Sequence, residues 1–382
     1  MVVYTKDTQL ALIHIPLPLY YTFLQPILAL LLPAKNRPDS SGSDGISNAR
    51  PRTWPYEHPF VNVSVTPVEC SVVCSRVSAE KLFLPVLEAL PETSRSQVSV
   101  GNEDFIVMQV DGEGLDAGQR VLELTSPLAM AGISIFFITT YFSDYILVPL
   151  RCRGQVVHAL EDRGFQFEQN TSTYVNPTHQ RRASTDIPPP PGTPPPATVH
   201  ELQTRTFATL KRRHIVPTVD SELRLIQCAG SRDSSIHTNG NDSKSFSPQD
   251  DALHLGLVKC FITLPHPPFL SLTLTDTEPA SVLLEQSLVS NFTSRDNVLL
   301  GTQSDCLIPI TLDLRDLPLE ATGIVCGVAG RLVGGTAHGS LQSPVEMSYL
   351  STARAGTVMV SEDELDRALE ALKGGENGVL AD

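Results

Sequence analysis

Short apolar runs of strand length recur along this chain, and segments with helical spacing of apolar residues stand between them. In the first half, the runs predict strands at Leu10–Ile15, Phe60–Val65, Ser71–Val77 and Phe105–Val110, and a hairpin within Ile133–Pro149. The helical spacing falls on Tyr21–Leu32, Ala79–Leu90, Leu115–Met130 and Gly154–Arg163. Strands and helices that alternate at this spacing are typical of an α+β fold.

The second half repeats part of this order. Strands are predicted at Val258–Leu264, Phe269–Thr275 and Leu307–Leu314, a hairpin within Val345–Ser361, and helices at Pro279–Val289, Gly323–Val333 and Glu362–Lys373. The two hairpin segments match at an offset of 212 residues, which makes Thr140 correspond to Thr352. A repeat of this kind indicates a duplicated unit. We interpret the chain as four small α+β modules in two pairs, each an antiparallel sheet with helices on one face.

Three polar stretches interrupt the pattern, at 35–56, 171–200 and 231–251, and the last of them is predicted to be a disordered insertion. Residues 188–196 hold seven prolines, which is typical of an extended linker. The predicted divisions are module 1 at 1–98, module 2 at 99–170, a proline-rich linker at 171–205, module 3 at 206–303, module 4 at 304–376 and a tail at 377–382. Ser184 follows two arginines in the linker and is a candidate kinase site, with an unmodified solvated linker as the alternative.

Charge narrows the choice of partners. Acidic residues outnumber basic ones 42 to 28, which gives a formal charge of -14. Because nucleic acids and anionic membranes attract a basic surface, we expect neither as the main partner of this chain. The seven cysteines include no recurring C-x-x-C pair, so no metal site is expected and a reducing cytoplasm is indicated. Residues 9–34 are the one candidate for a membrane or signal segment, but His14, Gln25 and four prolines interrupt them. The alternative for 9–34 is a strand followed by a short buried helix.

Catalytic motifs are weak or missing in the sequence. Residues 105–124 imitate the strand–glycine–helix start of a dinucleotide-binding domain, but the spacing is G-x-G-x-x-x-G. The sequence contains no Walker A loop, no H-E-x-x-H and no G-x-S-x-G. We therefore expect neither a cofactor nor enzymatic activity.

Residues 132–149, GISIFFITTYFSDYILVP, resemble the second ACT module of the CASTOR family, the cytosolic arginine sensors that act on TOR signalling. Residues 321–333 and 347–360 look like the fourth module of that family, 60–82 like part of its first, and 269–284 like part of its third. The resemblance spans most of the chain outside the polar stretches. It implies a ferredoxin-like βαββαβ fold for each module, no catalysis and a possible homodimer.

The resemblance also implies two sites. In the family an amino acid binds between the second and fourth modules, and the positions that match are Ser134, Ile135, Gly323, Ile324, Val325 and Thr352. For Ile324 and Val325, helix core is an equally good interpretation. The family holds a GATOR-type protein complex on the turn of its second module, which corresponds to Tyr141, Phe142 and Asp144. For the aromatic pair, a hydrophobic seam between modules is the alternative.

The sequence departs from the family where a guanidinium group would need carboxylates. The acidic positions of the family align with Ala321 and Gly356, and an aromatic position aligns with Ala353. Glu320 and Glu346 lie near and are candidate substitutes, whereas Arg354 would repel arginine. We therefore expect a small amino acid other than arginine, or no ligand. The hypotheses are an amino-acid sensor that controls a partner surface, a ligand-free scaffold, and a regulatory subunit of an amino-acid biosynthetic enzyme.

Overall fold

The computed structural model describes residues 2–32, 58–111, 116–168, 196, 198–230, 248–292, 298–301, 305–319, 321–334 and 344–373. The predicted kinase site at Ser184, the candidate Glu320 and the tail at 377–382 lie outside these residues, as do most of the three polar stretches. Within the described residues, no helix is long and apolar enough to cross a membrane.

All strands belong to one continuous hydrogen-bonded system. In the first half they are β1 (Val2–Ile15), β2 (Phe60–Val65), β3 (Cys70–Ser75), β4 (Ser99–Val100), β5 (Phe105–Asp111), β6 (Phe136–Thr139), β7 (Ser143–Pro149) and β8 (Gln166–Glu168). In the second half they are β9 (Thr218–Val219), β10 (Leu225–Gly230), β11 (Leu270–Thr275), β12 (Ser281–Glu285), β13 (Leu299–Leu300), β14 (Leu307–Asp313), β15 (Ser348–Ser351) and β16 (Ala355–Ser361).

The α-helices are α1 (Leu24–Leu31), α2 (Arg76–Ser78), α3 (Leu84–Ala89), α4 (Glu92–Arg95), α5 (Ala117–Met130), α6 (Arg153–Glu161), α7 (Val199–Arg212), α8 (Pro248–Ile262), α9 (Ile324–Gly334) and α10 (Leu365–Lys373). A π-helical turn, η2 (Ala79–Phe83), joins α2 to α3. Short 3₁₀ turns are η1 (Leu17–Phe23), η3 (Leu150–Cys152), η5 (Gln286–Asn291) and η6 (Glu362–Glu364).

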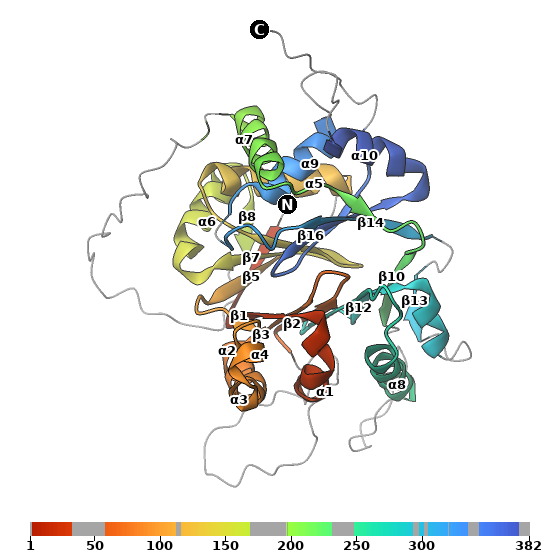
Figure 1. The fold of residues 1–382 in the computed structure, drawn as a ribbon. Coiled ribbons are helices and arrows are strands. Elements are labelled where there is room, and N and C mark those ends of the chain that lie inside the picture. Colours follow the sequence, from red (N-terminus) through yellow and green to blue (C-terminus); the bar gives the residue numbers. More distant parts are fainter. Residues whose placement is uncertain are drawn as a thin grey trace, which may run out of the picture.

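The molecule has four layers, with two sheets in the middle and helices outside them (Figure 1). The upper sheet runs β5-β7-β6-β15-β16-β14, and the lower sheet runs β10-β12-β11-β2-β3-β1. The pairs β1–β5 and β10–β14 join the two sheets at their ends, so the strands form a closed circuit. Helices α5, α6, α7, α9 and α10 cover the upper sheet, and α1, α3, α4 and α8 cover the lower one (Figure 1).

Apolar side chains fill three layers of core. One cluster lies between the upper sheet and its helices, a second lies between the lower sheet and its helices, and a third lies between the sheets. On β7, Ile146 and Val148 face the helices, while Tyr145 and Leu147 face the lower sheet. Because both faces of these strands are buried, their sequences are continuous apolar runs rather than alternating ones.

The two halves have matching parts. The upper sheet joins β5, β7 and β6 of the first half to β14, β16 and β15 of the second, and β6 and β15 meet antiparallel at Ile138 and Leu350, which are 212 residues apart. The lower sheet joins β3 and β2 to β12 and β11 in the same way, with Val63 opposite Leu272. The strand pairing therefore relates the two halves by a pseudo-two-fold axis, which the repeat alone did not predict.

Several predicted elements agree with the structure, and others were wrong. Residues 258–262 belong to helix α8, and 258–264 contain no strand, because Leu253, Leu257, Cys260 and Phe261 form one helical face that packs on the lower core. Residues 279–289 contain strand β12 and the turn η5 instead of a helix. The repeat was therefore aligned one element early here, and the partner of hairpin β2–β3 is β11–β12.

Three boundaries also differ. The first strand begins at Val2, since its N-terminal part pairs with β5 and its C-terminal part with β3. The predicted linker 171–205 ends in helix, because Thr198 caps α7 through its side chain and α7 packs on α9. Helix α8 starts at Pro248, inside the stretch 231–251 that the sequence predicts to be disordered.

Candidate functional site

The upper sheet contains a seam, β6 against β15, that is only partly closed by backbone pairing. Ile138 and Leu350 form its one registered pair. On either side of that pair a hydroxyl accepts from a strand N–H: Ser351 Oγ from Phe137 N at 2.9 Å, and Thr139 Oγ1 from Tyr349 N at 3.1 Å. Side chains thus replace the backbone carbonyls that an antiparallel ladder would normally supply.

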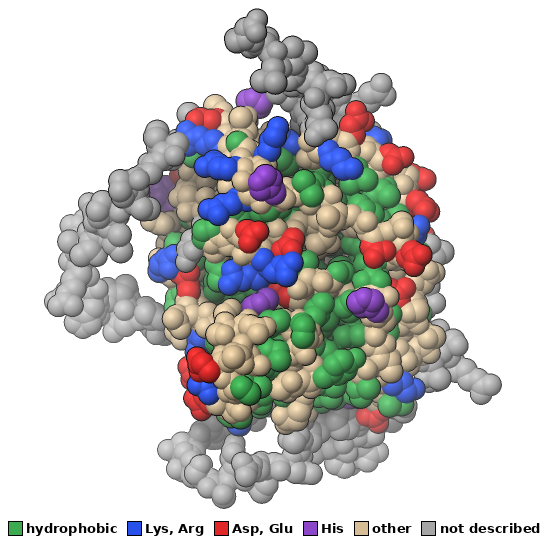
Figure 2. All heavy atoms as spheres, in the orientation of Figure 1, with side chains coloured by type: hydrophobic (Ala, Val, Ile, Leu, Met, Phe, Trp, Pro, Cys, Tyr) green, Lys and Arg blue, Asp and Glu red, His purple; other side chains and the backbone are tan. Residues whose placement is uncertain are grey.

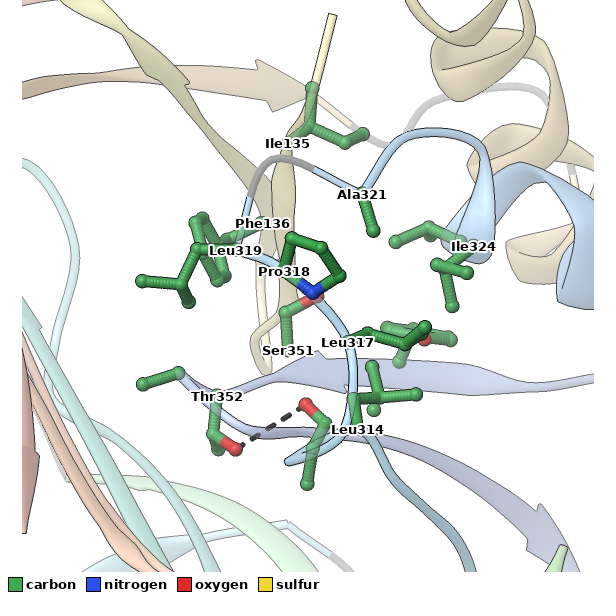
Figure 3. Close-up of a pocket in the computed structure, with 15 residues that line it drawn as sticks. Ile135, Phe136, Leu314, Leu317, Pro318, Leu319, Ala321, Ile324, Ser351 and Thr352 are labelled. Atoms are coloured by element: carbon green, nitrogen blue, oxygen red, sulfur yellow. Dashed lines mark hydrogen bonds between the residues drawn. The ribbon is translucent and has the colours of Figure 1, made fainter. Parts of the chain in front are cut away.

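A cavity opens at the Thr352 end of this seam (Figure 3). Its walls come from the start of β6, the loop from β14 to α9, the start of α9 and the hairpin β15–β16, with Ile135, Phe136, Leu314, Leu317, Pro318, Leu319, Ala321, Ile324, Val325, Tyr349, Ser351, Thr352, Ala353, Ala355 and Gly356 as lining residues. The space open to the centre of a water molecule is about 50 Å³. Roughly 10–15 Å³ of such space holds one water, so this cavity has the size of a few waters or one compact ligand group.

A smaller hollow of about 20 Å³ adjoins this cavity, between α5 and α9. The two hollows share Ile135, Ala321, Ile324 and Val325 as lining residues. Together they follow the boundary between the two halves of the upper layer.

The loop from β14 to α9 covers the cavity, with Pro318 and Ala321 between Ile135 and the strands (Figure 3). It folds as two consecutive turns, in which Leu317 N donates to Leu314 O at 2.9 Å and Ala321 N donates to Pro318 O at 3.0 Å. Leu314 N also donates to Arg354 O at 2.8 Å, which ties this cover to the β15–β16 turn. The fixed φ of a proline suits the loop, because it lowers the entropy lost on ordering the turn.

Gly323 ends the loop in a left-handed conformation, with φ of 81°. A Cβ there would lie 2.8 Å from Leu202 of α7, and Thr206 of α7 donates to the Gly323 carbonyl at 3.3 Å. Glycine is required at this position both for the turn and for the close approach of α7. No helix was predicted at 199–212, so this neighbour of Gly323 was missed.

Most of the predicted ligand residues come together around the two hollows. Ile135, Ile324 and Val325 line both, Thr352 lines the larger one and Gly323 the smaller one. Ile324 and Val325 are also part of the upper core, as the helix-core interpretation predicts, and their role in binding a ligand stays a prediction. Ser134 is half-buried and lines neither hollow, and Glu346 is exposed away from them.

The described lining of the cavity carries no charged side chain. Its polar side chains are the hydroxyls of Tyr349, Ser351 and Thr352. Ser351 and Thr352 already bond inside the protein, whereas Tyr349 Oη lies beside Gly356 in the lining. Burial raises the pKa of Tyr349, so its hydroxyl stays protonated and able to donate. Sequence reasoning missed Tyr349, which reads as an ordinary strand residue.

Tyr349 also explains the small residue at 356. A Cβ added to Gly356 would lie 2.3 Å from Tyr349 Oη. The tyrosine hydroxyl therefore occupies the space beside the position where the resembling family has an acidic residue.

The predicted partner residues divide into two environments. Tyr141 and Phe142 lie on the β6–β7 turn with 38% and 42% exposure, and their rings meet edge to face at 4.9 Å. They are thus open to contact and do not form a buried seam. Asp144 is fully buried, and its carboxylate accepts from Arg120 Nε of α5. Burial raises the pKa of Asp144, and the Arg120 charge opposes this rise.

The face of the molecule shown in Figure 2 carries basic and acidic side chains side by side over its upper half, and mostly uncharged side chains over its lower half. Among the described residues, no cluster of three histidine, cysteine, aspartate or glutamate side chains is placed to hold a metal ion.

Comparison with known proteins adds two findings. Residues 100–162, which hold β5 to α6, match the family model described as an ACT domain. The chain is also similar to a relative from Rattus norvegicus named cytosolic arginine sensor for mTORC1 subunit 1, at 24% identity over 347 residues, 88% of this chain and 96% of the relative.

The Homo sapiens protein of the same name is 22% identical over 351 residues, covering 88% of this chain and 96% of that protein. Among solved structures, aspartate kinase from Synechocystis aligns with a TM-score of 0.32 at 11% identity, covering 100% of this chain and 57% of that one. A likeness of that extent carries no argument about fold or function. The ACT match and the similarity over most of the chain support a divergent relative of these sensors.

Proposed function

We propose that this chain is a non-enzymatic amino-acid-binding regulator made of four ACT-like modules, with its ligand between the second and fourth. The ACT match covers the second module, and the similarity to arginine sensors covers most of the chain. The matching strand pairing of the two halves supports the same unit in the second half. Modules 1 and 3 then share the lower sheet, and modules 2 and 4 share the upper one.

The observation that carries this proposal is the cavity at the partly closed seam. It lies beside the start of α9, where the first backbone N–H groups of a helix have no intrahelical acceptor. A ligand carboxylate at Ile324 and Val325 would accept from those groups and would be favoured by the helix dipole. The ligand's side chain would lie against Ile135, Leu317 and Tyr349.

Such walls favour a compact neutral amino acid over arginine. A buried guanidinium needs a carboxylate partner, and the described lining supplies none. Tyr349 Oη is a polar group of the lining that can donate, so the best side chain is small and either apolar or able to accept one hydrogen bond.

Calorimetric titration of the purified full chain with each of the twenty amino acids tests the ligand. We expect one or more small neutral amino acids to bind and arginine to bind more weakly. Ala321→Leu fills the cavity and should abolish binding, whereas Ala159→Leu on α6, also half-buried but outside the lining, should leave it unchanged. Tight arginine binding would contradict the choice of ligand, and no binding by any amino acid would favour the ligand-free scaffold.

We further propose that ligand occupancy controls the Tyr141–Phe142 surface. Strand β6 begins next to Ile135 and Phe136 in the cavity and ends just before Tyr141, so one short strand joins the two places. A ligand that binds one arrangement of the seam more tightly than another would shift the position of this turn. Exposed aromatic pairs are common anchors of protein interfaces.

The relatives' names refer to mTORC1, so the proposed partner is a GATOR-type complex of TOR signalling in the cytoplasm. Affinity capture with the wild type and with a Tyr141→Ala, Phe142→Ala double variant, followed by mass spectrometry, tests this. Loss of TOR-pathway proteins only in the variant supports the proposal. Capture of an amino-acid biosynthetic enzyme instead would favour the regulatory-subunit alternative.

A further inference from the structure

Two turns of the lower sheet carry the same pattern, Thr-x-x-Glu, and both reach the upper sheet. Thr66–Glu69 connects β2 to β3, and Thr275–Glu278 lies between β11 and β12, at the corresponding place in the second half. The threonine hydroxyl accepts from the glutamate N–H in each, at 3.4 Å from Glu69 N and 3.1 Å from Glu278 N. These local bonds fix each glutamate side chain so that it points out of its own turn.

Glu69 binds the turn that forms one wall of the cavity. Its Oε1 accepts from Thr352 Oγ1 at 2.6 Å and from Arg354 N. Ser71 Oγ, close by on β3, accepts from Ala353 N at 3.2 Å. Glu69 is fully buried, and its Oε2 bonds His14 Nδ1 on β1. The β15–β16 turn is therefore held by side chains of the lower sheet.

Glu278 binds the corresponding turn of the first half. Its Oε1 accepts from Ser143 Oγ and from Gln109 Nε2, the latter at 2.9 Å, and its Oε2 accepts from Tyr145 Oη at 2.8 Å. Ser281 Oγ accepts from Tyr141 N at 2.9 Å, as Ser71 does from Ala353 N. The turn that carries the exposed aromatic pair is thus held from the lower sheet as well.

We propose that Glu69 and Glu278 are positioning residues, through which the lower sheet sets the geometry of the ligand cavity and of the Tyr141–Phe142 surface, respectively. The role assigned to each turn rests on the proposed function. The two contacts themselves are independent of it. Removing Glu69 leaves the amide of Arg354 without its acceptor and leaves the Thr352 hydroxyl only its longer bond to Ala355 O, at 3.3 Å, which loosens the cavity wall. Removing Glu278 takes an acceptor from the hydroxyls of Ser143 and Tyr145 without touching the cavity.

The two glutamates are matched controls for each other, because each is a carboxylate that binds a hairpin turn of the upper sheet. Hydrogen–deuterium exchange of the full chain, without ligand, compares Glu69→Ala with Glu278→Ala. We expect Glu69→Ala to raise exchange about tenfold or more in 348–359 and to leave 136–147 near wild type, since a lost charge-assisted bond corresponds to about that factor. Glu278→Ala should give the reverse pattern. Equal rises in both hairpins, or none in either, would overturn the proposal.

A second pair of variants, with smaller changes in side chain, keeps the test decisive if an alanine variant of either glutamate does not fold. Ser71→Ala and Ser281→Ala each remove one hydroxyl acceptor and should loosen the same two hairpins separately, with smaller rises. Glu69→Gln retains a carbonyl oxygen for Arg354 N, so it should restore most of the protection that Glu69→Ala loses. Failure of this rescue, with no separation between the serine variants, would also overturn the proposal.

Titration with the twenty amino acids then separates this inference from the proposed function. If a ligand exists, Glu69→Ala should weaken its binding about tenfold or more, and Glu278→Ala less than about twofold, because only Glu69 touches the cavity wall. Separate loosening of the hairpins with no amino acid binding to the wild type would support the positioning role and refute the ligand. Equal weakening in both variants would contradict the assignment of Glu69 to the cavity.

Discussion

The two seams between the halves of this protein differ in how completely their strands pair. In the lower sheet, β2 and β11 are in register over all six residues of each strand, from Val65 opposite Leu270 to Phe60 opposite Thr275. In the upper sheet, β6 and β15 share one registered pair and complete the seam with hydroxyl acceptors. Both seams join a strand of the first half to its counterpart in the second half, yet only the upper seam adjoins the cavity described above. The space for this cavity exists because the backbone pairing of β6 with β15 ends before Phe136 and Thr352.

The two ends of the upper seam differ as well. At the Thr352 end, Gly356 and Ala353 line the cavity. At the Thr140 end, the residue corresponding to Gly356 is Asp144, which is buried and paired with Arg120. At these two related positions, therefore, one end of the seam has a cavity lining and the other a buried ion pair.

The largest expected effect on stability comes from breaking the buried ion pair of Arg120 and Asp144 at the Thr140 end of the upper seam. Arg120→Met should destabilise the chain by about 3–5 kcal/mol at neutral pH, because it leaves the Asp144 carboxylate buried and unpaired. Urea unfolding measures this. Arg315→Met is the control, since its ion pair with Asp313 is exposed and should contribute only about 0–1 kcal/mol.

The pH dependence of the same variant checks the cause. Burial already raises the pKa of Asp144, and loss of Arg120 removes a charge that lowers it. A carboxyl whose pKa is raised by folding favours the folded state more as the pH falls, since it can then fold in its neutral form. The deficit of Arg120→Met relative to the wild type should therefore shrink as the pH is lowered. A deficit that stays constant with pH would mean that lost packing, not charge, is responsible.

A middle-sized effect is expected at the hydroxyl acceptors of the upper seam. Ser351→Ala and Thr139→Val each leave a strand N–H without an acceptor and should cost about 1–3 kcal/mol of unfolding free energy. Ser271→Ala in the lower seam should cost less, because its hydroxyl bonds only Asn62 and Ser64 side chains beside an intact backbone ladder. If all three substitutions lower the unfolding free energy equally, the hydroxyls of the upper seam do not replace backbone acceptors as proposed.

The smallest expected effect on stability is at the Thr352 end of the upper seam, where Gly356 lies against Tyr349. Gly356→Ala should destabilise the chain by about 1–2 kcal/mol, because the new methyl group collides with Tyr349 Oη. In a Tyr349→Phe background the same change should be neutral or stabilising, since alanine loses less backbone entropy than glycine in a strand. A double-mutant cycle by thermal unfolding measures this coupling. Additive effects would show that Tyr349 does not occupy the space beside Gly356.

Local sequence signals predicted most of the strands correctly. Phe60–Val65 was placed to the residue, and β5, β7, β14 and β16 lie within their predicted runs to within one residue, because each is a short run buried on both faces. The prediction failed where helical and strand spacing overlap, at 258–264, and at α7, whose buried face of Leu202, Thr206 and Leu210 begins inside the stretch predicted to be linker. The family resemblance brought Ile135, Gly323 and Thr352 to one seam. The roles of Tyr349, of the 314–319 loop and of the buried Asp144 depend on contacts that no local pattern encodes.

The sequence by itself determined the α+β class, the duplication at 212 residues and the hairpins that meet at the seam, since strand period and turn chemistry are local properties. Only the tertiary structure decided that one seam is fully paired and the other is not. It also decided that two Thr-x-x-Glu turns bind the opposite sheet, and that Tyr349 rather than a carboxylate lies beside Gly356. The strand pairing of the seams and the contacts of the two glutamates depend on which residues lie opposite each other once the halves and the sheets pack together. Residues in such contacts are separated by more than a hundred positions in the chain, as Glu69 and Thr352 are. The contact of Tyr349 with Gly356, by contrast, lies within the β15–β16 hairpin.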